Sequence, residues 1–236
     1  MIVRVLGLTS YLGFLAAFLY FLAFVTGFLP GQAPAGSLAS ALAIDVALVA
    51  FFGVVHSVMA RPGFKRWSAR WVPAAAERSL YVLVASAQLA LLVWQWRPLS
   101  GPSIWSASAP LSTILTGAQL LGFGIAFLST CLIDHFELFG LKQTVSYAMG
   151  RPHEPPKFRE RLFYRWVRHP LMLGFLIAFW ATPVMSQGHL LFALVTTAYI
   201  LIAIQIEERT LVHLHGDHYR DYQRRVGMLL PFGRAQ

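Results

Sequence analysis

Six apolar stretches separated by polar connections dominate the chain. Four of them reach the length of about 18 residues or more that a helix needs to cross a bilayer. The last two are shorter, and Pro183 and Gly188 favour two short spans with a tight turn over one continuous helix. The six stretches are Leu6–Phe28, Leu38–Met59, Ser79–Trp96, Leu111–Ile133, Leu171–Met185 and Leu190–Ile206.

The pattern predicts an all-α fold, a polytopic transmembrane helical bundle of about six spans. Residues 1–133 would form a four-span membrane scaffold, and residues 134–236 would form the catalytic region. That region would combine an interfacial segment, a C-terminal helical hairpin and a polar cytoplasmic tail. Residues 134–168 are too polar to cross, and Phe136–Leu141 is amphipathic enough to lie at the membrane surface.

The positive charges fall on alternate connections. Residues 60–78, 134–170 and 207–236 hold five, seven and five Lys and Arg, which is 17 of the 19 in the chain. With six spans, all three segments lie on one side, which the positive-inside rule makes cytoplasmic. We therefore expect an integral membrane protein, of a bacterial inner membrane, with both termini in the cytoplasm.

The composition agrees with a membrane protein, since 57% of residues are hydrophobic and only 12% are charged. The net charge of +9 could suggest a nucleic-acid partner. However, the basic residues are confined to the connections, where orientation and anionic lipid explain them better. The expected partners are the lipid bilayer and a small molecule, with no nucleic acid.

A basic approach ends at Pro170, where the first arm of the hairpin begins. Proline is favoured in the first helical turn, and the free N–H groups of that turn form an anion site. Arg168 and His169 would reinforce this site. Gly174 lies four residues on, on the same helical face, and would let a ligand approach the backbone.

Two carboxylates, Glu207 and Glu208, follow the second arm of the hairpin. They are acceptors that could hold sugar hydroxyls, so the two ends of the hairpin suit a ligand with a carboxylate at one end and a ribose at the other. The alternative is that Arg-His and Glu-Glu are ordinary solvated ends of two spans. Spacing alone leaves both interpretations open.

Three motifs carry a family resemblance. They are Arg168-His169-Pro170-x-x-x-Gly174, Glu207-Glu208-x-x-Leu211, and Gly216-x-x-Tyr219-x-x-Tyr222-x-x-x-Val226 followed by Pro231. In order and spacing they resemble the C-terminal signature of the isoprenylcysteine carboxyl methyltransferase family, a superfamily of membrane methyltransferases that use S-adenosylmethionine. The sequence departs from the pattern at Met172, where the wider family often has tyrosine, and at His215, where it usually has an aromatic residue.

The resemblance implies a cofactor, S-adenosylmethionine, and a set of residues around it. Arg168 and its neighbours would face the methionine carboxylate, and the two glutamates would face the adenosine. The implied cofactor-binding residues are Arg168, His169, Pro170, Gly174, Glu207, Glu208, Tyr219 and Tyr222.

The segment Asp134-His135-Phe136-Glu137-Leu138-Phe139-Gly140-Leu141-Lys142-Gln143 resembles the branch of the superfamily that methylates methanethiol to dimethyl sulfide. Such a reaction needs a thiolate, because the thiolate and not the thiol is the nucleophile. His135 is the candidate base, with Asp134 as an orienting residue or an alternative base. The other interpretation of His135 is an interfacial residue at the end of a span.

Other functions stay open at this stage. A methyltransferase of the same superfamily could act on a prenylcysteine carboxylate or a lipid, and a non-catalytic, haem-carrying or sterol-reductase-like membrane protein is also conceivable. His213, His215 and His218 point in different directions on a helix, so no metal site is expected there. Asp45 and His56 share a face of the second span, where they could be functional or could hydrogen-bond neighbouring helices.

Overall fold

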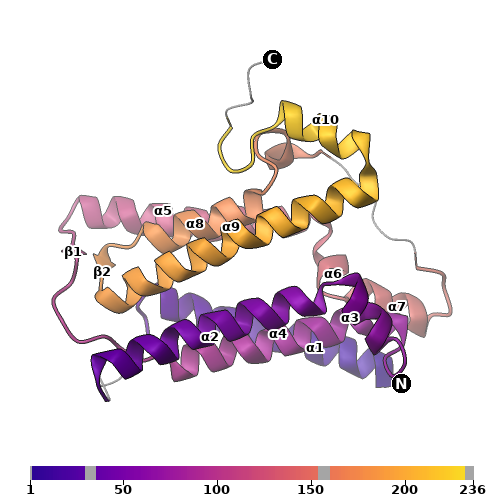
Figure 1. Cartoon of the computed structure of the whole chain (residues 1–236), viewed down its shortest axis with the longest axis horizontal. Helices are drawn as coiled ribbons and strands as arrows, with labels where there is room; N and C mark the ends of the chain where they lie inside the picture. Colours follow the sequence, from indigo (N-terminus) through magenta and orange to yellow (C-terminus); the bar gives the residue numbers. More distant parts are fainter. Residues whose placement is uncertain (1, 30–35, 154–159, 232–236) are drawn as a thin grey trace. The chain divides into compact units, whose positions relative to one another are not determined.

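The computed structural model describes residues 2–29, 36–153 and 160–231 and is built largely of helices (Figure 1). The chain forms two compact units. Met1–Gly101 and Asp134–Lys157 make the N-terminal unit, and Pro102–Ile133 and Phe158–Gln236 make the C-terminal unit. The division predicted at residue 133 does not coincide with these units. The fourth span packs with the C-terminal helices, and the segment after it packs with the first and third spans.

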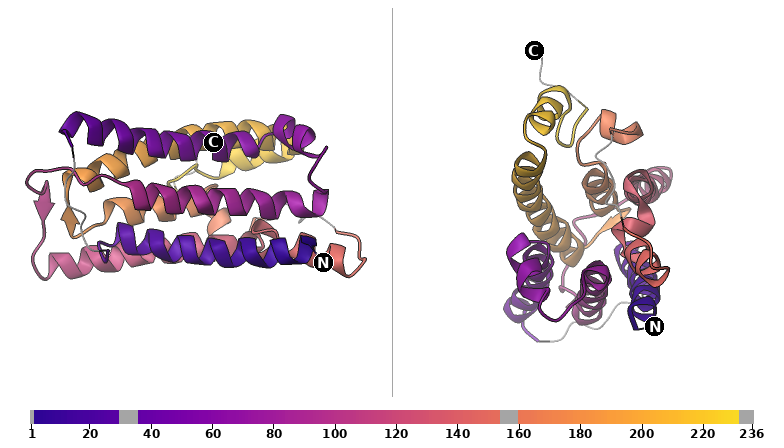
Figure 2. Two further views of the ribbon diagram at one scale, coloured as in Figure 1. Left: turned by 90° about the horizontal axis from the view of Figure 1, so that it is seen from below. Right: turned by 90° about the vertical axis from the view of Figure 1, so that its right-hand side faces the viewer.

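In the N-terminal unit, α4 lies between α1 and α2 (Figure 2, left). The short helix α7 packs on both α1 and α4. Small residues at these contacts let the backbones come close together. Gly7 faces Thr144, and Ser79 Oγ donates to the Gly140 carbonyl at 3.2 Å. The helices of this unit are α1 (Ile2–Val25), α2 (Leu38–Met59), α3 (Pro62–Ser68), α4 (Ala74–Gln95), α6 (His135–Leu138) and α7 (Leu141–Ala148).

Two polar side chains, the buried Asp45 and the partly buried His56, join α2 to the rest of this unit. Asp45 Oδ1 accepts a hydrogen bond from the Arg97 N–H at 2.8 Å, and His56 Nε2 lies 2.7 Å from the Tyr81 hydroxyl. Of the two sequence interpretations, these contacts favour hydrogen bonding between neighbouring segments.

The C-terminal unit is organised by the pair α5 and α8, whose backbones lie in close contact. A Cβ at Gly122 would come within 2.6 Å of the Gly174 carbonyl oxygen, and a Cβ at Gly174 within 2.6 Å of the Ala126 nitrogen. Small residues spaced four apart commonly pack transmembrane helices in this way. The elements of this unit are β1 (Trp105–Ser106), α5 (Leu111–Ile133), the 3₁₀ turn η1 (Leu162–Arg165), α8 (Pro170–Trp180), β2 (Val184–Met185), α9 (Gln187–His215) and α10 (Asp217–Arg225).

Replacing Gly174 with alanine is expected to destabilise the C-terminal unit by about 1–3 kcal/mol, because the new methyl group meets backbone atoms that cannot yield. Gly124→Ala on α5 is the matched control, since a Cβ there meets no atom within 4 Å among the described residues. Both variants gain the same helix propensity, so the difference reports packing. Thermal unfolding in detergent is the measurement, and equal stability of the two variants would contradict the close contact.

The hairpin has two unequal arms, so the predicted lengths of about 15 and 17 residues are wrong. The first helix, α8, has only 11 residues, and α9 has 29. Helix α8 ends at Trp180 because Thr182–Met185 turns into β2, which pairs antiparallel with β1. Helix α9 continues past the apolar stretch until Gly216, whose φ of +57° lies in the left-handed region.

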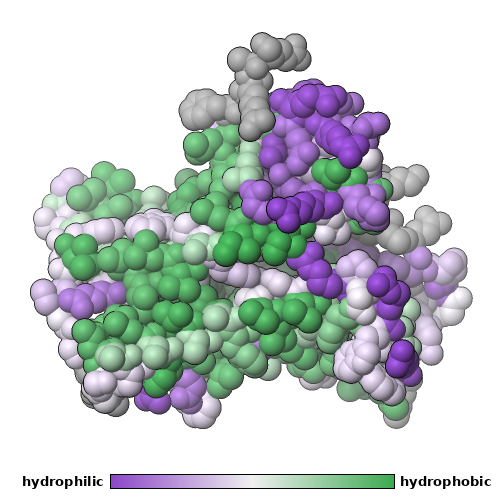
Figure 3. Space-filling view, viewed as in Figure 1, coloured by the Kyte–Doolittle hydropathy of each residue, from purple (hydrophilic) through white to green (hydrophobic). Residues whose placement is uncertain are grey.

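Among the residues that the structure describes, five helices are long and apolar enough to cross a membrane, namely α1, α2, α4, α5 and α9, and α8 is a shorter apolar helix. At about 1.5 Å per residue, α8 measures about 16 Å, roughly half of a bilayer core. Hydrophobic residues cover much of the visible surface of α9, whereas the end of the C-terminal unit that carries α10 is hydrophilic (Figure 3). The predicted polytopic helical bundle is confirmed.

Candidate active site

The segment that leads into α8 is tied to the segment that follows α10. The Arg168 N–H donates to the Gly227 carbonyl at 2.8 Å, and the His169 N–H donates to the Met228 carbonyl at 3.1 Å. These bonds bring two motifs that lie about 60 residues apart in the sequence side by side. Pro170 stands at the start of α8, as predicted.

The Arg168 side chain is nearly buried and bridges three elements. Its Nε donates to Glu208 Oε1 at 2.6 Å, and its Nη1 donates to the Gln223 carbonyl at 3.1 Å and also to the Val226 carbonyl. Two of the three guanidinium nitrogens therefore hold α9 and the end of α10 against the start of α8.

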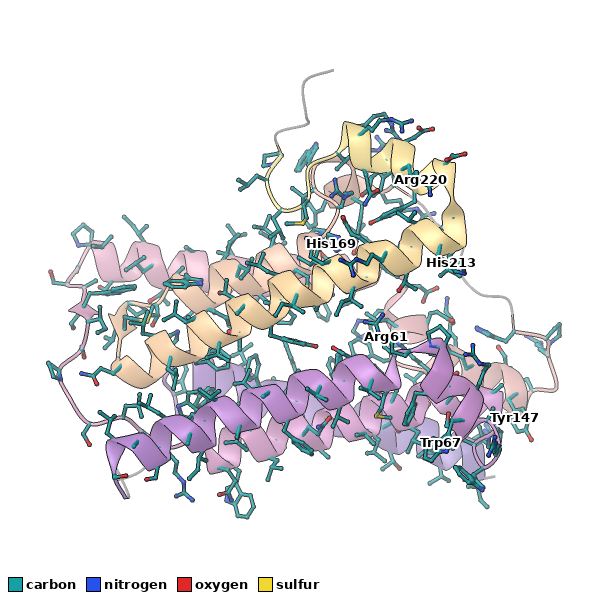
Figure 4. The ribbon with its side chains drawn as sticks, in the orientation of Figure 1. Arg61, Trp67, Tyr147, His169, His213 and Arg220 are labelled. Carbon is teal, nitrogen blue, oxygen red and sulfur yellow. The ribbon has the colours of Figure 1, made fainter. Side chains whose placement is uncertain are left out.

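His169 is 6% exposed and lies between the two glutamates of α9. Its Nε2 is 3.1 Å from Glu208 Oε1, and its Nδ1 is 3.7 Å from Glu207 Oε2. Figure 4 shows His169 where the start of α8 meets α9, well before His213 near the end of α9. The structure thus brings together Arg168, His169, Glu207 and Glu208, which the sequence analysis had grouped as cofactor-binding residues.

The two glutamates have different environments, a difference that the sequence did not reveal. The Glu208 carboxylate accepts from Arg168, from His169 and, at 2.9 Å, from Gln223 Nε2. The Glu207 side chain is 50% exposed. Glu208 therefore serves as an internal clamp, whereas Glu207 presents a carboxylate that a ligand can reach.

Tyr219 and Tyr222 are each 1% exposed and pack against Val226, Leu211 and Val212, which fixes α10 on α9. The Tyr222 hydroxyl donates to the Tyr164 carbonyl at 2.5 Å. Burial raises the pKa of both phenols, so their hydroxyl groups stay protonated at neutral pH. Their observed contacts are those of a packed core beneath the polar cluster, and their contact with a cofactor stays a prediction.

Gly174 does not lie at the polar cluster in the way that its spacing from Pro170 had suggested. The space that a side chain at Gly174 would fill is taken by Ala126 and Gly122 of α5. The missing side chain therefore allows helix packing, and the observed contacts give no sign of a ligand approaching the backbone there.

A surface hollow of about 290 Å³ adjoins the cluster on the side of Glu208. Sequence reasoning missed most of its lining. The sequence does indicate part of it. Residues 205, 208, 209 and 212 are spaced three and four apart, so they lie on one face of a helix. The lining residues are Gln205, Glu208, Arg209, Val212 and Gln223.

The predicted base, His135, lies in the N-terminal unit, in an aromatic environment. Its Nε2 is 2.9 Å from the Tyr11 hydroxyl, and its ring centroid lies 4.8 Å from that of Phe139 and 5.4 Å from that of Phe136. Burial lowers the pKa of His135 below its usual value, although the neighbouring Asp134 opposes this shift. The imidazole is therefore neutral at neutral pH and able to accept a proton.

Asp134 caps α6, since its Oδ1 accepts from the Glu137 N–H at 3.2 Å, and its Oδ2 pairs with Lys142. Burial disfavours the ionised carboxylate, but these hydrogen bonds outweigh burial and hold the pKa of Asp134 below its usual value. Both oxygens thus already have partners, and the carboxylate is a weak base. The contacts of this pair favour His135 over Asp134 as the proton acceptor.

The fold and the cluster define a polytopic helical membrane protein with a buried Arg–Glu–His network and an exposed carboxylate beside it. Comparison with known proteins identifies the family. The NnrU protein family matches residues 45–217, and the chain belongs to this family.

Several relatives cover nearly the whole chain. Methanethiol S-methyltransferase 2 of Bradyrhizobium diazoefficiens is 50% identical over 228 residues, which is 95% of this chain and 88% of that protein. Methanethiol S-methyltransferase of Mycobacterium tuberculosis is 49% identical over 231 residues, 96% of this chain and 94% of that protein. Nurim of Rattus norvegicus is 31% identical over 197 residues, 79% of this chain and 74% of that protein. No solved structure matches the chain. The methyltransferase resemblance drawn from the motifs is confirmed.

Proposed function

We propose that this chain transfers the methyl group of S-adenosylmethionine to methanethiol and forms dimethyl sulfide within the membrane. The observation that carries the proposal is identity of 45–50% to several methanethiol S-methyltransferases, most of them matched over about 95% of the chain. The motif residues support it, because Arg168, His169 and Glu208 meet in one network.

The side chains of the cluster fit the charges of S-adenosylmethionine. Arg168, His169 and the first-turn N–H groups of α8 are donors suited to a carboxylate. The exposed carboxylate of Glu207 suits the cationic amino group or the ribose hydroxyls. When bound, S-adenosylmethionine would supply a methyl group on a sulfonium sulfur, so that in-line attack of a thiolate on the methyl carbon would break the carbon–sulfur bond and release S-adenosylhomocysteine.

His135 supplies the thiolate in this proposal. A neutral imidazole can take the proton of methanethiol, and the surrounding rings of Tyr11, Phe136 and Phe139 provide apolar surroundings for a methyl thiol. A dry site favours a reaction in which a cation and an anion lose their charges together. His135 Nε2 lies 2.9 Å from the Tyr11 hydroxyl, so in this proposal Nε2–H donates to that hydroxyl and the thiol proton goes to Nδ1.

The proposed topology has six crossings with both termini in the cytoplasm of a bacterial cell, and with the protein in the inner membrane. Pairing of β1 with β2 supports it, because the start of α5 and the end of α8 must then lie at the same end of the C-terminal unit. Helix α8 and the extended residues after it would make the fifth crossing. The three basic segments then share the cytoplasmic side.

Single cysteines test this topology in a chain from which Cys131 has been removed. Lys65→Cys and His218→Cys are expected to react with an impermeant thiol reagent from the same side of sealed membranes. Ser103→Cys, in the connection that carries β1, should react from the opposite side. Labelling of positions 65 and 218 from opposite sides would contradict the six-crossing arrangement.

The acceptor is tested with membranes that contain the overproduced protein and S-adenosylmethionine labelled in its methyl group. Methanethiol, ethanethiol and a prenylcysteine are offered separately, and volatile and lipid-soluble products are analysed. Labelled dimethyl sulfide from methanethiol is the expected result. Label in the prenylcysteine alone would exclude methanethiol and indicate a carboxyl methyltransferase.

A further inference from the structure

The hollow beside Glu208 is lined by Glu208, three other polar residues and Val212, and the apolar parts of these side chains make up more of its surface than the polar parts do. Of these residues, only Glu208 belongs to the family motifs. Its walls come from two helices, with Gln205, Arg209 and Val212 on α9 and Gln223 on α10. Two residues with side-chain amides therefore line a space of about 290 Å³ at the edge of the Arg168–Glu208–His169 network.

The orientation of the Gln223 amide follows from its partner. An ionised carboxylate only accepts hydrogen bonds, so the atom 2.9 Å from Glu208 Oε2 must be the amide nitrogen, Nε2. The carbonyl oxygen of Gln223 then points away from Glu208 and remains an acceptor. The hydrogen bond to Glu208 thus fixes the orientation of the Gln223 amide, and with it the position of the carbonyl oxygen.

Gln205 provides the complementary donor. Its Nε2 is 3.6 Å from the Met228 sulfur, which is a weak acceptor, and it carries a second N–H. Arg209 adds a planar guanidinium that can stack on an aromatic ring, and Val212 adds an apolar surface. A flat heterocycle that offers an amino group beside a ring nitrogen acceptor matches this arrangement.

We infer that the hollow recognises the adenine base of the methyl donor, with the Gln223 oxygen accepting from the exocyclic amino group and the Gln205 amide donating to the adjacent ring nitrogen. This inference rests on the proposed function and extends it to residues outside the motifs. It also gives Glu208 a role. Glu208 is hydrogen-bonded both to Arg168 and His169, which would bind the methionine carboxylate, and to the Gln223 amide, which would bind the adenine.

The prediction separates adenine from hypoxanthine. Deamination replaces the amino donor with a carbonyl acceptor and places a proton on the adjacent ring nitrogen. Neither contact can then form a hydrogen bond. The new carbonyl oxygen would face the Gln223 oxygen, and the new ring N–H would face the Gln205 N–H. A hydrogen bond of this kind changes affinity about threefold to tenfold. Two mismatched contacts should therefore weaken binding at least about tenfold.

The test is calorimetric titration of the purified protein in detergent with S-adenosylhomocysteine and with S-inosylhomocysteine. The wild type should bind the adenosyl compound at least about tenfold more tightly. Gln205→Ala and Gln223→Ala should each show a smaller preference of about threefold to tenfold, which the remaining contact gives. Gln187→Ala is the matched control, because Gln187 lies on the same helix and its amide reaches Pro102 at the other end.

The preference of the wild type for one compound requires no mutation, so a variant that misfolds does not remove the test. Equal affinity of the wild type for the two compounds, or an unchanged preference in both hollow variants, would overturn the inference and leave the proposed function standing. Failure of the folded wild type to bind S-adenosylhomocysteine at all would contradict the proposed function, and the inference with it.

Discussion

Replacing His135 with alanine is expected to lower the rate of dimethyl sulfide formation by about 10²–10⁴-fold at neutral pH, the usual contribution of a positioned general base. Binding of S-adenosylhomocysteine should be unchanged, because the donor-binding residues that we propose lie in the C-terminal unit and His135 lies in the other. The variant thus separates proton removal from cofactor binding.

The pH dependence makes this prediction specific. Burial lowers the pKa of His135, so the wild-type base is already neutral at pH 7 and stays so at higher pH. A free thiol has a pKa of about 8.5 or above, so solution supplies more thiolate as the pH rises. The deficit of His135→Ala should therefore shrink toward high pH.

Dimethyl sulfide formation from methanethiol is measured between about pH 6.5 and 10, a range that spans the ordinary pKa values of histidine and thiols. Asp134→Asn is assayed in parallel, and its rate should stay close to that of the wild type at every pH. An equal deficit of His135→Ala at every pH would assign His135 a packing role. A pH-dependent deficit in Asp134→Asn alone would transfer the base to Asp134.

Replacing Glu208 with alanine is expected to destabilise the C-terminal unit by about 3–5 kcal/mol, because it leaves the buried Arg168 guanidinium without its carboxylate. The side chains of Arg168 and Glu208 are only 10% and 11% exposed, so water cannot replace the lost partner. His169 and Gln223 lose the same acceptor. Donor binding should fall together with stability.

Glu207→Ala is the matched control, since it removes the same side chain one residue away. The Glu207 side chain is half-exposed and its ion pair with His169 is longer, at 3.7 Å, than the pair between Arg168 and Glu208. The free energy of unfolding should therefore change by less than about 0.5 kcal/mol. Affinity for S-adenosylhomocysteine should still fall about tenfold, the scale of one charge-assisted hydrogen bond. Thermal unfolding and calorimetric titration in detergent separate the two effects. Equal loss of stability in both variants would contradict the assignment of a structural role to Glu208 and a ligand-binding role to Glu207.

The membrane helices were largely predictable, because length and apolarity decide whether a segment can span a bilayer. The helices Leu38–Met59 and Leu111–Ile133 begin and end where the apolar runs do. The hairpin was not predictable in detail. Its second helix continues through charged residues to His215. The helix ends at the left-handed backbone conformation of Gly216 and not where the apolar stretch ends.

The candidate site was predictable only as a set of residues. The motifs pointed to Arg168, His169 and the two glutamates, and the structure joins them. The different roles of Glu207 and Glu208 depend on which way each carboxylate faces, which adjacent positions in a sequence do not reveal. Gln223 was missed because it reaches Glu208 only once α10 folds back on α9.

The central claim is tested most directly by following the methyl group with purified protein. The protein in detergent or liposomes is given S-adenosylmethionine with a deuterated methyl group and unlabelled methanethiol, and the volatile product is analysed by mass spectrometry. We predict dimethyl sulfide that carries one deuterated methyl group, formed together with an equal amount of S-adenosylhomocysteine and reduced in His135→Ala. Folded protein that binds S-adenosylhomocysteine but forms no labelled dimethyl sulfide would contradict methyl transfer to methanethiol.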